Sequence, residues 1–134
     1  MSKKNSVDEP ITVHWKNSPD AHDYPAAANY LSLITTPEKA NALAEKLKTA
    51  DLVTFKAKDI LRSSRLPLLP MDDPHVLIDL RKVAAGVELS PVLLIRGDMS
   101  KNHLTQIADG YHRVCASYHL SENTDIPVRI ADAG

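Results

Sequence analysis

Apolar positions recur along this chain with two different periods, and the changes of period mark the predicted helices and strands. Between residues 25 and 50 they recur every three or four positions, which predicts a pair of helices. The second helix has a clear start, because Thr36 can cap it and Pro37 suits its first position. Its buried face is expected at Ala40, Leu43, Ala44 and Leu47.

From residue 52 onward, short apolar runs alternate with helical patterns. Strands are expected at residues 52–57, 91–96, 104–108 and 126–130. Helices are expected at residues 58–62, from Asp73-Pro74 to the region of Gly86, and at residues 111–120. The second and third strands flank a polar turn, which predicts a hairpin. Because Pro127 lacks a backbone N–H, we expect either an edge strand or a strand start there.

These elements predict an α/β (α+β) fold, a small mixed sheet with packed helices. Residues 1–24 are polar and lack periodicity, so we expect a tail or arm whose ordering depends on Trp15 finding an apolar surface. Residues 25–134 are expected to form one domain, in which residues 25–50 are a helical addition and residues 52–132 are the core.

Composition limits the partners. With 134 residues, 25% charged residues and a net charge of −1, the chain has no general attraction for nucleic acid or anionic membranes. No apolar stretch reaches the length of a membrane span, and residues 1–15 lack the apolar run of a signal peptide. We therefore expect a cytoplasmic protein without a membrane partner. Cys115 is the single cysteine, so an intrachain disulfide is excluded.

The segment most informative about function is the predicted passage from a strand through Asp109-Gly110 into a helix that opens with Tyr111, His112 and Arg113. A helix start offers unpaired N–H groups and the positive end of a dipole, and glycine lets the backbone approach a ligand. Arg113 adds a planar set of donors. These five residues predict a site for a di- or triphosphate, with Mg²⁺ between the phosphate and Asp109.

The same residues also fit a purely structural interpretation. Asp109 would then cap the helix, Gly110 would serve a tight turn, and Arg113 would form a surface ion pair. Cys115 has two interpretations as well. It falls on the same helical face as Val114 and other apolar residues, which favours a core position over a nucleophile.

No metal site is predicted from the histidines. His112 and His119 are seven residues apart, which on a helix separates them by about 10 Å. One ion cannot bind both across that distance.

A basic cluster lies near the first predicted strand, at Lys56, Lys58, Arg62 and Arg65. It can be a solvated face or can contact a nucleic-acid backbone. The nearest carboxylates that can serve as a base or a metal ligand are Asp59, Asp72 and Asp73. For Asp73 a helix cap before Pro74 is favoured.

The order of four segments resembles the ParB/sulfiredoxin superfamily. The segments are Val53-Thr-Phe-Lys-Ala-Lys-Asp-Ile-Leu, the helix from Pro74, Leu89-Ser-Pro-Val-Leu-Leu-Ile and Ile107-Ala-Asp-Gly-Tyr-His-Arg. The resemblance implies the family fold over residues 52–132 and a Gly-x-x-Arg turn that holds nucleotide phosphates. It also implies that the region of Lys58 and Arg65 approaches the nucleotide.

Within the superfamily, Asp109-Gly-Tyr-His-Arg113 is most similar to the Asp-Gly-His-His-Arg of free-serine kinases. Tyr111 stands where sulfiredoxins have their catalytic cysteine, which argues against sulfinic-acid repair. In ParB proteins the turn reads Gly-Glu-Arg-Arg and a helix-turn-helix domain follows, whereas this sequence ends at Gly134. This difference argues against site-specific DNA partitioning.

The leading hypothesis is a protein that binds a nucleoside triphosphate or diphosphate with Mg²⁺, as a phosphotransferase or nucleotide hydrolase. Asp109, Gly110, Tyr111, His112, Arg113, Lys58 and Arg65 would bind the nucleotide, and His112 and Asp59 would be catalytic. The alternative is a non-catalytic ParB-like module that binds DNA or a protein partner. Whether the chain is an enzyme is left open by the residues themselves.

Overall fold

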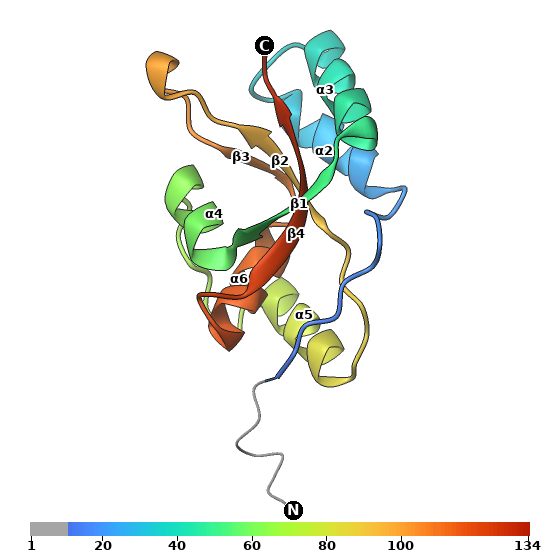
Figure 1. Ribbon diagram of the computed structural model, residues 1–134, viewed down its shortest axis with the longest axis vertical. Coiled ribbons are helices and arrows are strands. Elements are labelled where there is room, and N and C mark those ends of the chain that lie inside the picture. Colours follow the sequence, from blue (N-terminus) through green and yellow to red (C-terminus); the bar gives the residue numbers. More distant parts are fainter. Residues whose placement is uncertain (1–10) are drawn as a thin grey trace, which may run out of the picture.

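The structure, a computed structural model, describes residues 11–134 and contains a four-stranded mixed sheet (Figure 1). The strands are β1 (Leu52–Lys56), β2 (Val92–Arg96), β3 (Gln106–Asp109) and β4 (Asp125–Asp132), in the order β1-β4-β2-β3. Strand β4 is antiparallel to β1 and parallel to β2, and β2 and β3 are antiparallel. The predicted α+β class and the predicted hairpin are confirmed.

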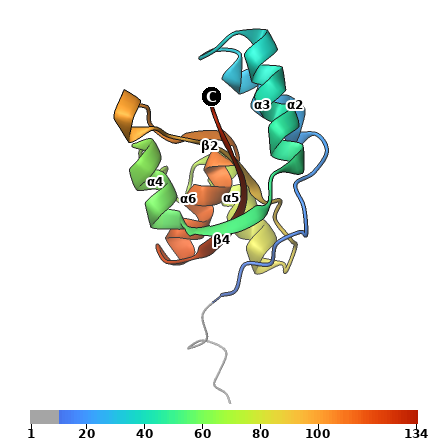
Figure 2. The same ribbon diagram turned by 45° about the horizontal axis from the view of Figure 1, so that its top comes forward.

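Helices cover both faces of this sheet. One face is covered by α2 (Asp23–Leu31) and α3 (Pro37–Thr49). On the other face lie α4 (Ala57–Ser64) and α6 (Tyr111–Leu120), with α5 (Pro74–Ala84) packed against α6. Figure 2 shows the sheet between these two groups. A short 3₁₀ helix, η1 (Met99–Lys101), forms the tip of the hairpin. Among residues 11–134, no helix has the length and apolar character needed to cross a bilayer.

Strand β2 joins the two cores. Val92 and Leu94 pack among the helices α4, α5 and α6, while Leu93 and Ile95 pack against α2 and α3. Successive side chains of a strand point to opposite faces, so a strand buried on both sides reads as the unbroken apolar run seen in the sequence.

The helix starts follow the predicted local chemistry. The Thr36 hydroxyl accepts a hydrogen bond from the Lys39 N–H, and the four predicted residues of the α3 face are all buried. The Asp73 carboxylate accepts from the N–H groups of His75 and Val76. Gly86 follows α5 with φ +76°, the left-handed conformation expected where a helix ends.

Strand β4 lies inside the sheet, so the edge position considered for it is wrong. Pro127 is the third residue of β4 and pairs with Thr54 of β1. The pairing of β4 with β2 begins only at Val128. Pro127 therefore stands one residue before that ladder, where a missing N–H is tolerated. As the third of the eight residues of β4, it lies near the start of the strand and not at its first position.

The segment before α2 is packed against the fold. Trp15 pairs with Leu89 in a parallel bridge and packs against the core between the sheet and the helices α4, α5 and α6. Helix α2 begins at Asp23, two residues before the expected start at Pro25. Of the expected tail, residues 1–10 lie outside the described residues, and residues 23 and 24 are buried in α2.

Candidate functional site

The expected strand-to-helix junction is present, with α6 running over the predicted residues Tyr111–Leu120. Gly110 precedes the helix with φ +109°, and no side chain caps the helix start. The first helical hydrogen bond joins the Val114 N–H to the Gly110 carbonyl oxygen. The N–H groups of Tyr111 and His112 have no partner among residues 11–134 and can bind an anion. Asp109 does not cap α6, contrary to the structural interpretation.

A bulge in the hairpin sets the position of Asp109. Leu93 pairs with Asp109 and Leu94 pairs with Ile107, so Ala108 is an extra residue in β3. A bulge turns the chain locally and redirects the neighbouring side chains. It brings Asp109 and the turn at Gly110 to the end of the sheet where β2 begins.

Arg113 folds back over Gly110 and binds carboxylates. Its Nη2 lies 2.9 Å from Asp109 Oδ2 and 3.8 Å from Asp23 Oδ2, and donates to the Pro91 carbonyl oxygen at 3.5 Å. The Arg113 side chain is only 16% exposed, so this is a half-buried ion pair rather than the surface pair considered above. Its Nε is buried without a hydrogen-bond partner in the described part of the chain. One donor of the guanidinium is thus engaged, and another is unsatisfied.

The chain before α2 supplies the other half of this site. The buried Asp23 carboxylate accepts a hydrogen bond from the Ser90 hydroxyl, which in turn accepts the Asp20 N–H at 3.0 Å. Lys16 pairs with Asp20 at 2.8 Å. These contacts hold the residues before α2 against the start of β2.

Asp20, His22 and Asp23 form a group with metal-ligand chemistry. Each offers one ligand atom, and the three atoms lie within 4.8 Å of one another. Ligands of one divalent ion at about 2.1 Å lie roughly 3–4 Å apart, so the three side chains would have to move closer together to hold an ion. Lys16, which donates to both oxygens of Asp20, would also have to move away. Sequence analysis missed these residues because it assigned them to a tail. The only local signal was three donor side chains in the run Asp20-Ala-His-Asp23.

Burial raises the pKa of two carboxyl groups near Arg113, those of Asp109 and Asp79. Burial raises the pKa of Asp109, the Arg113 guanidinium opposes this, and the nearby Asp23 carboxylate raises it further. Burial also raises the pKa of Asp79 on α5, and Arg113 again opposes the shift. Asp109 contacts the Arg113 guanidinium directly, and the charge of the same guanidinium also acts on Asp79. Perturbed carboxyls in one place are typical of functional sites, and of structural ion-pair networks as well.

The side chain of His112, in the first turn of α6, lies against the start of α5. Its ring centroid is 4.8 Å from that of His75 and 5.7 Å from that of Tyr111. The Tyr111 hydroxyl donates to the Pro67 carbonyl oxygen and so fastens the loop between α4 and α5 to the helix start. His112 is half-buried beside the uncapped N–H groups.

Lys58, Arg65 and Asp59 are placed elsewhere. Lys58 and Arg65 line an open hollow of about 470 Å³ with Tyr118 of α6, and none of residues 109–113 lines it. Asp59 pairs with Arg62 at 3.1 Å on α4. The structure therefore does not bring these three residues to the junction, and the carboxylates that contact Arg113 there are those of Asp23 and Asp109.

The basic cluster is partly neutralised. Lys56 pairs with Asp125 at 3.6 Å, and Arg62 pairs with Asp59. Neither contact favours a nucleic-acid surface at this position. Cys115 is fully buried in the core, and burial raises the pKa of its thiol, so it takes the core position that its spacing favoured.

Comparisons with protein-family models, with characterised proteins and with solved structures found no match to this chain. Its function therefore has to follow from its own residues.

Proposed function

We propose that the junction between β3 and α6 binds the phosphates of a nucleotide together with a divalent cation. One observation carries the proposal. The uncapped start of α6 lies beside the ligand group Asp20, His22 and Asp23, and Arg113 links the two through Asp23. Helix N-termini bind phosphate, and carboxylates bind divalent cations, so the two halves suit the two parts of a metal–nucleotide complex.

The charges of the site explain why the cation belongs to the proposal. Asp23 and Asp109 lie within 4 Å of a single guanidinium, that of Arg113, and Asp79 is near enough for the same guanidinium to lower its pKa against the effect of burial. A phosphate without a cation would be repelled by these carboxylates. A divalent cation bound to Asp20, His22 and Asp23 would supply the neutralising charge. Carboxylate ligands suit Mg²⁺ and Mn²⁺, and the imidazole suits Zn²⁺.

The protein residues would have separate tasks. The N–H groups of Tyr111 and His112 would donate to phosphate oxygens, and the unsatisfied Nε of Arg113 would become a further donor after a small side-chain rotation. The His112 ring would contact the phosphate or exchange a proton with it. The resemblance of the segment order to the ParB/sulfiredoxin superfamily supports the same turn as the phosphate site.

The test is isothermal titration calorimetry with ATP, ADP, CTP and GTP, each with Mg²⁺, with Mn²⁺ and with EDTA. We expect at least one nucleotide to bind, and only when a cation is present. The absence of binding for all four nucleotides with both cations would overturn the proposal. Phosphate release in the same samples tests for hydrolysis.

His112→Glu is the most informative variant. A carboxylate in the first turn of a helix stabilises that helix, yet repels phosphate from it. We expect nucleotide affinity to fall at least tenfold while thermal stability is kept. His14→Glu is the matched control, because His14 has an exposed side chain outside the site. Equal affinities for the two variants would contradict phosphate binding at α6.

The cation is tested separately with His22→Ala, whose side chain is 82% exposed and can be removed without opening the core. We expect Mn²⁺-dependent nucleotide binding to weaken. Unchanged cation dependence would exclude His22 as a ligand.

A further inference from the structure

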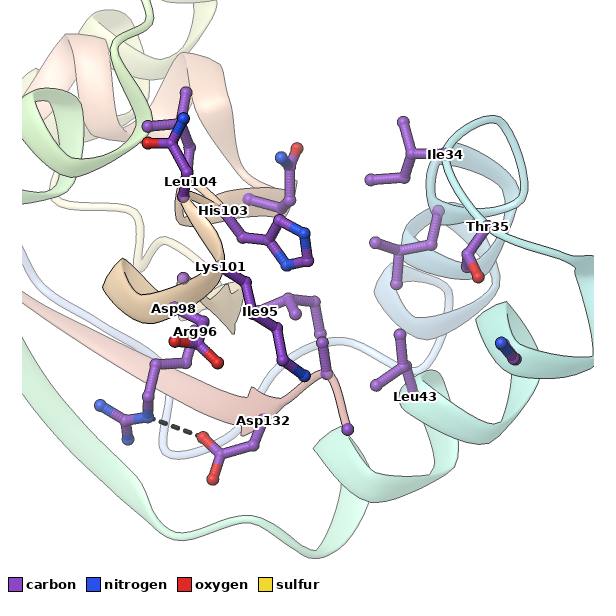
Figure 3. Close-up of a pocket in the computed structure, with 17 residues that line it drawn as sticks. Ile34, Thr35, Leu43, Ile95, Arg96, Asp98, Lys101, His103, Leu104 and Asp132 are labelled. Carbon is purple, nitrogen blue, oxygen red and sulfur yellow. Dashed lines mark hydrogen bonds and ion pairs between the residues drawn. The ribbon is translucent and has the colours of Figure 1, made fainter.

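A second cavity lies at the opposite end of the sheet. It has a volume of about 860 Å³ and opens between the pair α2 and α3 and the tip of the β2–β3 hairpin (Figure 3). Arg96 and Asp132, the last residues of β2 and β4, line it. The α6 junction lies at the other end of β2, near Ser90. One strand length, about 15 Å for five residues, thus separates the two places.

The inner wall of the cavity is apolar. Leu31 of α2, Leu43 of α3 and Ile95 of β2 are buried residues that line it, and Ile34 and Leu104 add exposed apolar surface at its sides. A volume of this size and such a lining are typical of sites for small organic molecules.

The charged residues of the cavity leave an excess of positive charge. Arg96 and Asp132 pair with each other at 2.7 Å, and the Asp98 carboxylate accepts hydrogen bonds from Ser100 but keeps its charge. The three basic side chains of the lining, Lys39, Arg96 and Lys101, therefore exceed the two acidic ones by one charge. Lys39 and Lys101 form no ion pair with any residue in the range 11–134. Figure 3 shows the side chains of Lys101 and His103 pointing from the hairpin toward α2 and α3.

We propose that this cavity binds a small amphipathic anion, an aliphatic chain that ends in a carboxylate. The chain would lie on Leu31, Leu43 and Ile95, and the carboxylate would pair with Lys101 at the mouth. Such a ligand satisfies both properties of the cavity, because apolar burial contributes affinity and the unpaired ammonium selects the charge. The site is independent of the nucleotide proposal and uses none of its residues.

The experiment compares three probes with the same chain and different head groups, namely decanoate, decanol and decyltrimethylammonium, by calorimetry below their micelle concentrations. We expect decanoate to bind at least tenfold more tightly than either of the others. Equal binding of decanol would show an apolar surface without charge selection and would overturn the proposal, as would an absence of decanoate binding. Inorganic phosphate serves as an anion without an apolar part, and we expect it not to compete.

Variants locate the site. Lys101→Gln should weaken decanoate binding about tenfold, and Lys101→Glu should abolish it, while the affinity for decanol should not change. Lys82→Gln on α5 is the control, since Lys82 is an exposed lysine far from the cavity lining. Sedimentation velocity over a range of concentrations tests whether a second copy covers the cavity instead. A dimer that decanoate does not dissociate would contradict the proposal.

Discussion

The Ser90 hydroxyl donates a hydrogen bond to the carboxylate of Asp23, a residue 67 positions earlier in the sequence. Both side chains are buried. This contact holds the start of α2 against the chain entering β2 and fixes the carboxylate that faces Arg113 at 3.8 Å. A single hydroxyl thus connects the segment before α2 to the junction that opens α6.

Ser90→Ala should lower the free energy of unfolding by about 1–3 kcal/mol, because a buried carboxylate and the Asp20 N–H each lose a partner. Urea denaturation measures the change. Ser18→Ala provides the control, since Ser18 is exposed. Equal stabilities of the two variants would show that the buried contact contributes nothing.

Gly110→Ala should be more destabilising than Gly86→Ala. Both glycines have positive φ, so an alanine at either position is strained by about 1–3 kcal/mol. Only at Gly110 would the added Cβ also come within 2.8 Å of Val92 Cγ2 and Arg113 Nη2, whereas Gly86 has open space. We expect the Gly110 variant to lose at least about 1 kcal/mol more in thermal or urea unfolding. Losses of the same size would argue against the close packing of Arg113 on Gly110.

Asp79→Asn should stabilise the protein at pH 7. Burial raises the pKa of Asp79 above its ordinary value of 3.8, so the folded protein holds this proton more tightly than the unfolded chain does. Ionisation of Asp79 therefore costs stability as the pH rises through the folded-state pKa. We expect the advantage of the asparagine variant at pH 7 to shrink as the pH falls toward 3.8. Urea unfolding between pH 3.5 and pH 7 measures it, and a constant difference would refute the expected linkage.

Asp73→Asn should change the stability at pH 7 in the opposite direction and destabilise the protein. The hydrogen bond from the Val76 N–H lowers the pKa of Asp73 below 3.8. The stability that its carboxylate contributes is present above pH 3.8 and is lost as the pH falls through the folded-state pKa. The variant should therefore be less stable than the wild type at pH 7, with a difference that shrinks in acid. The same series of urea curves compares both variants.

Cys115 should be unreactive in the folded protein. Its side chain is fully buried, and the raised pKa of the thiol leaves little thiolate. For a global stability of about 5 kcal/mol, we expect labelling by a disulfide reagent to be roughly 5,000-fold slower than in urea. Rapid labelling of the folded protein would place the thiol in contact with solvent and reopen a nucleophilic role.

The parts of the fold that were predicted correctly depend on local chemistry. Thr36-Pro37 and Asp73-Pro74 each combine a capping side chain with a proline at the first helical position, and both helices begin there. The continuous run in β2 likewise indicates a strand buried on both faces. These signals depend only on residues that are neighbours in the sequence, so the sequence alone is enough to predict them.

The order of the strands and the composition of the site depend on distant contacts. Pro127 fits inside the sheet because the pairing of β4 with β2 starts one residue later, and no local pattern reveals that register. Asp23 reaches the junction through Ser90 and Arg113, which are far away in the sequence. Lys58 and Arg65, by contrast, follow β1 as the sequence indicates, but they line the hollow of about 470 Å³ and not the junction between β3 and α6.

The central position of β4 has a consequence for how the protein folds. Strands β1 and β2 are not neighbours, and each pairs with β4, which is formed by residues 125–132. A growing polypeptide can make its helices and the β2–β3 hairpin early, but β1 has no strand to pair with before residue 132 has been synthesised. Pairing β1 with β4 closes a loop of about seventy residues, and only the contacts of the complete sheet offset the entropy lost in closing it. We therefore expect slow, all-or-none folding, in which β4 forms last and joins β1 to the β2–β3 hairpin.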